Sequence, residues 1–136
     1  MDIVLSIYPT YNKLIKEGIK NFEFRPFELT SETGEINMWV YETKPTMAIK
    51  YLMVVRNPVS VLNESSVYGL GNDKFNEIIS TGRVGYEIIK LYELVNKVPL
   101  SKMKLLGLCA PQNFLYLKNK PSLLKELKQS PLIQIL

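Results

Sequence analysis

Histidine is absent from the 136-residue sequence, and cysteine occurs once. Without an imidazole, catalysis by Ser-His-Asp or Cys-His groups and histidine-based zinc motifs are excluded. The single cysteine, Cys109, excludes an internal disulfide and any CxxC pair. Its apolar neighbours in "LLGLCAPQ" predict a small buried side chain rather than a reactive thiol. Any catalysis must therefore rely on Lys, Glu, Asp, Tyr or Thr.

Long apolar runs are also lacking. No stretch approaches the roughly 18 apolar residues of a membrane span, and the N-terminus "MDIVLSIYP" has no basic region like that of a signal peptide. The glycines form neither a GxxxxGK[ST] nor a GxGxxG phosphate loop. We therefore expect a cytoplasmic protein with no membrane association, no metal and no cofactor.

What the sequence does contain is the composition of one globular domain. It is 46% hydrophobic and 22% charged, which is typical of a chain with a single continuous core. The net charge of +4 is unevenly spread, because residues 1–95 carry 10 basic and 12 acidic residues, whereas residues 96–136 carry 7 lysines and one glutamate. This asymmetry suits a polyanionic partner such as nucleic acid. The alternative is an ordinary solvated, lysine-rich surface.

Hydrophobic periodicity predicts strands interspersed with short helices, an α+β arrangement. Residues 84–95 also have a competing helical pattern. The expected strands cover residues 3–7, 21–25, 36–43, 47–59 and 84–95; the expected helices begin at Pro9, cover residues 72–81 and 121–129, and include a helical turn that ends at Gly107.

The segment "KEGIKNFEFRPF" combines charged and aromatic residues in alternation. Strand geometry places Phe22 and Phe24 on one face, which we expect to be the core face, and Glu23 and Arg25 on the other. Lys20 follows the turn at Gly18 and is able to swing toward the polar face. Either these charges line a ligand site, or Glu23 and Arg25 form an ordinary surface salt bridge of little energetic value.

The longer segment "LSIYPTYNKLIKEGIKNFEFR" resembles the opening of ASCH domains, members of the PUA-like superfamily. In that family a strand ends in Ser-Ile-x-Pro, a helix follows, and the next turn and strand carry Gly-x-Lys-x-x-Glu-x-Arg. The residues that match the last motif are Gly18, Lys20, Glu23 and Arg25.

Two later segments also resemble the family. "VYETKP", residues 40–45, is similar to a strand ending in Tyr-x-Thr-x-Pro, and "APQNFLYL", residues 110–117, to a C-terminal Pro-Gln-x-Phe-x-Tyr stretch. The resemblance therefore implies an ASCH/PUA-like domain over residues 1–117. Residues 118–136 are then a basic C-terminal extension, packed on the same domain or trailing from it.

What the resemblance implies for the fold is a small PUA-like mixed β-barrel of five to six strands with short flanking helices. It also implies a cleft into which Lys20, Glu23 and Arg25 point, and we expect the basic C-terminal third to contribute to its rim. The family is generally taken to bind RNA or nucleotide-like ligands. No protein partner is indicated.

The chemistry of these residues suits nucleic acid. Arg25 offers a planar fork for phosphate or a base edge, Lys20 a point charge, and Glu23 an acceptor for an exocyclic amine. Further ligand contacts are expected at residues that either offer stacking surfaces or lie in the matching motifs: Tyr41, Thr43, Tyr86, Gln112 and Tyr116. For each tyrosine, packing in the core or at the rim is the alternative.

A hydrolase is the alternative function, with Lys20 and Glu23 as the candidate catalytic residues. The chain looks similar, at its Gly-x-Lys turn, to small amidohydrolases that deacylate acetylated cytidine, although Glu23 occupies the place of their threonine nucleophile. Glutamate beside lysine suits general acid–base chemistry with water as the nucleophile. A histidine-free ribonuclease and a protein-binding adaptor also remain open.

Overall fold

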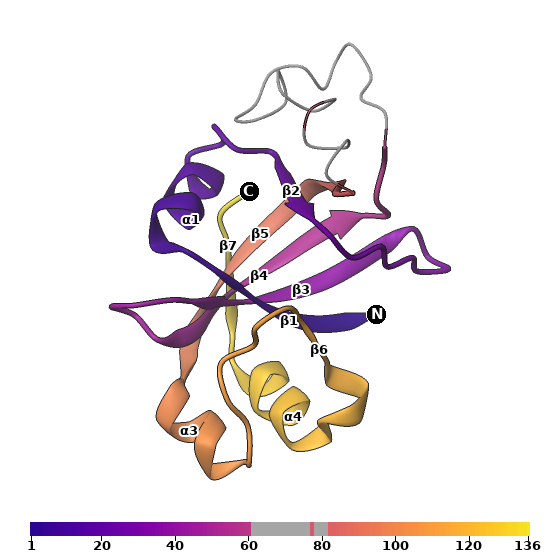
Figure 1. Ribbon diagram of the computed structural model, residues 1–136. Coiled ribbons are helices and arrows are strands. Elements are labelled where there is room, and N and C mark those ends of the chain that lie inside the picture. Colours follow the sequence, from indigo (N-terminus) through magenta and orange to yellow (C-terminus); the bar gives the residue numbers. More distant parts are fainter. Residues whose placement is uncertain (61–76, 78–81) are drawn as a thin grey trace.

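The computed structural model describes residues 1–60, 77 and 82–136 (Figure 1). Helices and strands alternate irregularly along the chain, as the α+β prediction requires. Their bounds in chain order are β1 Asp2–Ile7, α1 Pro9–Lys16, β2 Phe22–Arg25, β3 Glu35–Glu42, β4 Ala48–Arg56, β5 Val84–Pro99, α3 Leu100–Leu105, β6 Leu115–Tyr116, the 3-10 helix η3 Leu117–Asn119, α4 Pro121–Gln129 and β7 Leu132–Gln134.

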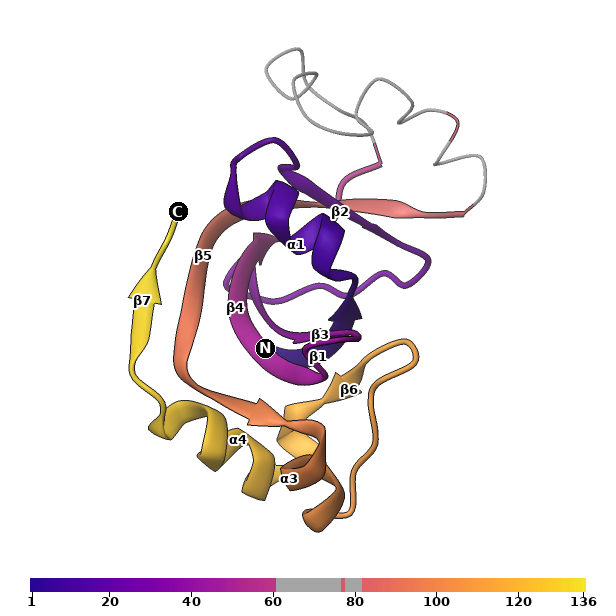
Figure 2. The same ribbon diagram turned by 90° about the vertical axis from the view of Figure 1, so that its left-hand side faces the viewer.

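These strands form one mixed sheet of seven, in the order β2-β5-β4-β3-β1-β6, with β7 paired to β5. Strands β1 and β3 are parallel, whereas the other neighbouring pairs are antiparallel. Long β5 bends as it crosses the sheet and pairs with β2 near its start and with β4 and β7 farther along. The sheet consequently curls into a half-barrel (Figure 2).

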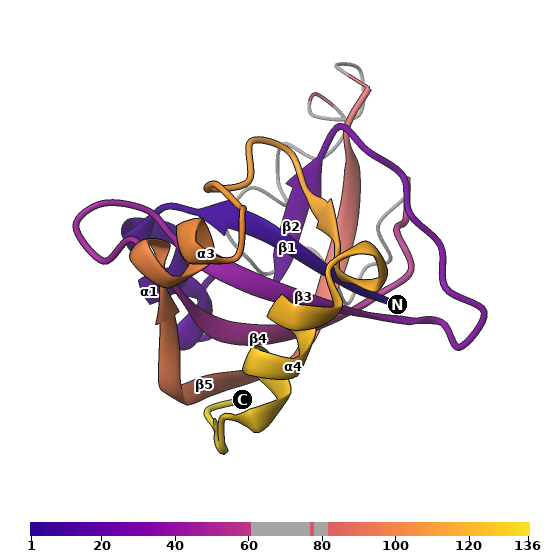
Figure 3. The same ribbon diagram turned by 90° about the horizontal axis from the view of Figure 1, so that it is seen from below.

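Alternation along the strands divides the apolar side chains between the two faces of this sheet. One cluster contains Ile3 and Leu5 and lies against α1, which adds Ile15. The other contains Val4 and Trp39 and extends to the helices α3, η3 and α4. In Figure 3, seen from below, α3 and α4 lie in front of the strands. The half-barrel is thus covered by different helices on its two faces.

Most of the expected elements are confirmed by the structure. The competing helical pattern in residues 84–95 is wrong, because β5 is a strand of 16 residues. Two strands were not foreseen: β6 and β7 are two and three residues long, too short to show a period in the sequence. The helix expected at residues 72–81 lies outside the described residues.

Cys109 is exposed, so the expectation of a small buried side chain is wrong. It lies in the connection between α3 and β6, which is neither helix nor strand. Apolar neighbours in the sequence therefore did not place its side chain in the core.

Tyr86, on β5, holds the connection between β2 and β3 in place through hydrogen bonds of its hydroxyl. Its side chain is completely buried. The hydroxyl donates to the Phe27 carbonyl oxygen at 2.7 Å and accepts the Leu29 backbone N–H at 2.9 Å. Burial raises the pKa of this phenol, and the charges of Glu28 and Tyr116 add to the increase. One side chain therefore satisfies two backbone groups that have left the sheet.

We predict that Tyr86→Phe lowers the free energy of unfolding by about 1–3 kcal/mol at neutral pH, because it leaves buried backbone groups without a partner. The raised pKa adds a pH dependence. Above about pH 10 the unfolded chain ionises this tyrosine and the folded chain does not, so wild-type stability falls as the pH rises.

Urea unfolding of both proteins between pH 7 and 11 measures these effects. The difference in the free energy of unfolding between wild type and Tyr86→Phe should become smaller above pH 10. A variant as stable as wild type at pH 7 would contradict the role of the hydroxyl.

Candidate functional site

The turn after α1 places Lys20 at the start of β2. Gly18 adopts a positive φ of 77°, and the Ile19 and Lys20 backbone N–H groups both donate to the Leu14 carbonyl oxygen, at 2.9 and 3.1 Å. A left-handed residue at this point suits glycine, which has no Cβ. The chain therefore reverses within one helical turn and brings the lysine back over the next strand.

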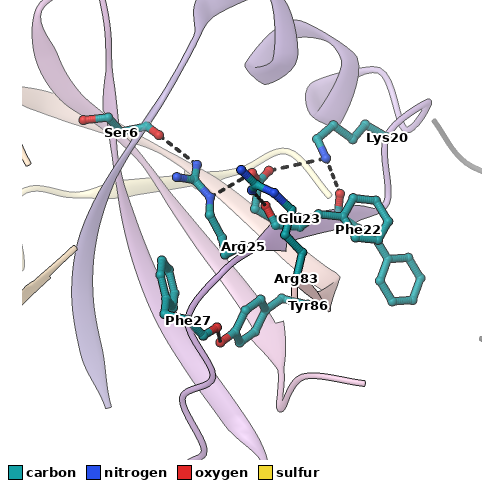
Figure 4. A network of polar contacts seen from close by, with 9 residues as sticks. Ser6, Lys20, Phe22, Glu23, Arg25, Phe27, Arg83 and Tyr86 are labelled. Carbon is teal, nitrogen blue, oxygen red and sulfur yellow. Dashed lines mark hydrogen bonds and ion pairs between the residues drawn. The ribbon is translucent and has the colours of Figure 1, made fainter. Parts of the chain in front are cut away.

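Lys20, Glu23 and Arg25 form one connected network (Figure 4). The Lys20 Nζ lies 3.4 Å from Glu23 Oε2, and the Arg25 Nε lies 3.1 Å from Glu23 Oε1. Lys20 also donates to the Phe22 carbonyl oxygen, and Arg25 Nη2 donates to the Ser6 carbonyl oxygen at 2.8 Å. The structure therefore brings together the three residues of the sequence motif and ties them to β1.

Burial distinguishes this network from a surface salt bridge. Lys20 and Glu23 are each 7% exposed, and the Arg25 side chain is 17% exposed. Exposed ion pairs contribute about 0–1 kcal/mol because water screens them, whereas buried charges interact strongly and must also be desolvated. Two cations around one carboxylate leave a net charge of +1 here. This is not the exposed Glu–Arg pair of the alternative interpretation.

The network retains unused hydrogen-bonding capacity. Within the described part of the chain, the buried Glu23 Oε2 receives no hydrogen bond, although Lys20 lies beside it. The Arg25 fork uses Nε and Nη2, and Nη1 has no hydrogen-bond partner among the described residues. A buried polar atom without a hydrogen bond is uncommon in folded proteins and costs free energy. An acceptor and a donor are thus available side by side.

The two faces of β2 alternate as expected, but the polar face is also enclosed. Glu23 and Arg25 do share one face, but this polar face turns toward β1, while Phe22 and Phe24 stack on each other with ring centroids 6.2 Å apart. Phe22 is buried, at 2% exposed, as the strand alternation predicted, and Phe24 is half-buried. The reason for the enclosure of the polar face is topological: β2 is the end strand of a curled sheet, so the side facing the barrel is also the side facing β1.

Two of the expected stacking residues are inside the protein. Tyr41 is 3% exposed and belongs to the cluster on the helix α3 and α4 face, and burial raises its pKa. Tyr86 is fully buried, as described above. Tyr116 is half-buried, edge-on to Phe114 at 5.0 Å, with the Lys118 Nζ 5.2 Å from its ring. Only Tyr116 of the three has a partly accessible ring.

Thr43 and Gln112 are placed around the network rather than in it. Thr43 is half-buried in the turn after β3, where its N–H donates to the Ile7 carbonyl oxygen at 3.2 Å. Gln112 is exposed and follows Pro111, whose carbonyl oxygen accepts the Ser6 hydroxyl at 2.7 Å. Ser6 therefore lies between Arg25 and the segment that carries Gln112.

A second buried carboxylate was missed by sequence reasoning. Glu42 is 5% exposed; it accepts the Asn12 amide at 3.2 Å and the Thr46 hydroxyl, and the Lys50 Nζ lies 3.8 Å away. Both oxygens are engaged, so this group joins α1 to the β3–β4 turn. No spacing in the sequence indicates it, because its partners come from three separate elements.

Lys50 is affected by this carboxylate. Its partial burial lowers the pKa, but the hydrogen bond to the Tyr51 hydroxyl and the charges of Tyr51, Glu42 and Glu93 outweigh burial, so the net pKa is raised. Lys50 is therefore a cation at neutral pH and supports Glu42 as a structural ion. Elsewhere in the described residues, no three His, Cys, Asp or Glu side chains gather to form a metal site, and no helix is both long and apolar enough to cross a bilayer.

No protein-family model and no curated protein matches the sequence. Solved structures do match. The ASCH protein of Zymomonas mobilis aligns with a TM-score of 0.69 at 18% identity, covering 96% of each chain. A variant of it with one tyrosine replaced by phenylalanine aligns with a TM-score of 0.70 at 16% identity, covering 96% of this chain and 99% of that one. A variant with one serine replaced by alanine aligns with a TM-score of 0.68 at 17% identity, covering 96% of each chain.

At this level of identity the similarity concerns the fold, and it covers 96% of the chain. The protein has the small α+β, PUA-like fold of ASCH domains.

Proposed function

We propose that the protein binds RNA, or a nucleotide-like ligand, at the network of Lys20, Glu23 and Arg25. The observation that carries the proposal is the buried Glu23 Oε2, which has no hydrogen-bond partner in the described chain although Lys20 lies beside it and Arg25 pairs with the other oxygen of the carboxylate. The ASCH fold of the chain supports the same direction, as a likeness of architecture.

The free groups of the network match the edges of nucleotides. The Arg25 Nη1 donates toward a phosphate or a base acceptor, and a guanidinium presents these donors in a fixed plane. Glu23 Oε2 accepts an N–H, such as the exocyclic amine of cytosine or adenine. Lys20 keeps the Glu23 charge compensated while the ligand is absent. A nucleotide supplies the complementary donor, acceptor and negative charge in one molecule.

Energetics also favour a binding role over a purely structural one. A buried ion pair seldom stabilises a fold more than well-packed apolar residues would, because desolvation offsets the attraction. Three charges in a site that leaves one oxygen unsatisfied are a poor solution for stability alone. They are a good solution for a polar ligand whose own groups complete the hydrogen bonds.

We predict that Arg25→Ala weakens RNA binding about 10- to 100-fold, the loss expected for one or two hydrogen bonds from a charged donor. Arg25→Lys should recover only part of it, because an ammonium lacks the planar fork. Fluorescence anisotropy with a panel of labelled short RNAs and mononucleotides, over a series of salt concentrations, measures the effect.

Arg56→Ala is the matched control, since Arg56 is an exposed arginine at the end of β4, paired with Glu87. It should bind like wild type. Thermal melts establish that each variant is folded. If wild type shows no salt-sensitive binding to any member of the panel, or folded Arg25→Ala binds as tightly as Arg56→Ala, the proposal is wrong.

A hydrolase is a second candidate, favoured by the 3.4 Å separation between Lys20 Nζ and Glu23 Oε2. An ammonium and a carboxylate side by side offer an acid and a base to one substrate, which is the arrangement that general acid–base catalysis uses. We predict that, if this function holds, wild type releases the free acid from N-acylated cytidine or cleaves RNA, and Lys20→Ala abolishes the product.

Chromatography of the reaction mixture detects both products. Lys13→Ala, at an exposed position of α1, is the control and should remain active. Absence of product from both substrates with pure wild-type protein would remove the hydrolase candidate and leave the binding proposal standing.

A further inference from the structure

The C-terminal third of the chain presents a basic surface, which we call the lysine layer. It is formed by the end of β5 and by α3, η3 and α4, and every lysine in it is exposed. Its members are Lys97, Lys102, Lys104, Lys118, Lys120, Lys125 and Lys128.

Most of the lysine layer lies on the opposite face of the sheet from the charged network; Lys118 is the exception, since its Nζ lies over the ring of Tyr116, which packs against the first apolar cluster. Helices α3 and α4 and η3 pack through Met103, Leu117, Leu123 and Leu127 onto the second apolar cluster, whereas α1 covers the first. In Figures 1 and 2, α3 and α4 lie at the bottom of the molecule and α1 with β2 at the top. Most of these lysines therefore lie away from the charged network. They form a surface of their own.

The charge of this layer is almost uncompensated. Glu126 is the single acidic residue after residue 95, and its Oε2 pairs with the Lys102 Nζ at 3.0 Å. The other six lysines have no acidic partner among the residues that the structure describes. Positive potentials of neighbouring lysines therefore add, and they attract a polyanion over roughly one Debye length, about 10 Å at 0.1 M salt.

Helix stability accounts for part of the layer but not for the rest. Lys102, Lys104 and Lys128 lie in the last turns of α3 and α4, where a cation favours the helix dipole. Lys120 is instead at the N-cap of α4, where a cation is unfavourable and no acidic residue follows in the first turn. Lys125 faces a like charge three residues on, at Lys128. These positions cost stability, which indicates a role outside folding.

We propose that the lysine layer binds the phosphate backbone of an RNA strand, without reading its sequence, as a second contact surface separate from the network. Ammonium groups act as hydrated point charges, which suits phosphates rather than base edges. Lys120 also lines a pocket between α3 and α4, in which Asn119 and Ser122 are the other polar residues and the remaining lining is apolar. The inference rests on the proposed function only in taking RNA as the polyanion.

The test compares two triple variants of equal net charge. One is Lys97→Gln, Lys120→Gln and Lys125→Gln, three members of the layer with no acidic partner in the described chain. The other is Lys13→Gln, Lys44→Gln and Lys90→Gln, three exposed lysines outside the layer. Each protein is titrated with a 20-nucleotide single-stranded RNA of mixed sequence between 0.05 and 0.3 M salt, and with mononucleotides.

We expect the layer variant to bind the 20-mer about tenfold more weakly at 0.1 M salt, with the slope of log affinity against log salt shallower by about 2, or roughly 0.7 per lost phosphate contact. The control variant should stay near wild type in both respects. Mononucleotide binding should be unchanged in the layer variant, because the network is intact.

The outcomes separate this inference from the proposed function. If the two triple variants bind the 20-mer with equal affinity and equal salt dependence, the proposal that the lysine layer binds RNA is wrong, whether or not Arg25→Ala loses binding. A shallower slope of log affinity against log salt in the layer variant supports RNA binding by the lysine layer, even if mononucleotides do not bind. A 20-residue polyglutamate peptide that binds the layer as tightly as the RNA would overturn the choice of RNA and point to an acidic protein.

Discussion

The Glu23 carboxylate organises the open side of the half-barrel. It accepts Arg25 on one oxygen and has Lys20 beside the other, and Arg25 in turn donates to the Ser6 carbonyl oxygen of β1. Strand β2 is at one end of the sheet and β1 is next to the other end, so no ladder hydrogen bonds join them. Charged side chains do so instead. Without the carboxylate, two buried cations would repel each other across this opening.

The division of the sheet into two faces explains why the buried charged network lies on one side and most of the exposed lysines of the last third on the other. Consecutive residues of β1 and β3 enter different apolar clusters, and each cluster is completed by its own helices. Lys20, Glu23 and Arg25 follow α1 in the chain and remain near it. The lysines come from the last third, which forms the helices of the other face. The two sets of charged residues, which lie far apart in the sequence, are therefore also apart in space.

The sequence predicted the long strands, helices α1 and α4, and the association of Lys20, Glu23 and Arg25, because these depend on periodicity and on a local turn. It did not predict their burial or orientation, which depend on how the sheet curls. Tyr41 and Tyr86 were candidate stacking residues with packing in the core as the alternative, and both lie in the apolar clusters. Arg25 donates to the backbone carbonyl oxygen of Ser6, and a pattern of side chains in the sequence cannot predict a backbone partner.

A buried charge with a missing hydrogen bond distinguishes this site within the described residues. The Glu42 group is also a buried carboxylate, but Asn12, Thr46 and Lys50 engage both of its oxygens, so it is complete as it stands. Glu23 has the same burial and is incomplete, since Oε2 lacks a hydrogen bond from the described residues. Both carboxylates are desolvated, but only Glu42 has hydrogen bonds from the described residues to both of its oxygens. The satisfied one joins structural elements, and the unsatisfied one is the place where a ligand gains most by supplying the missing donor.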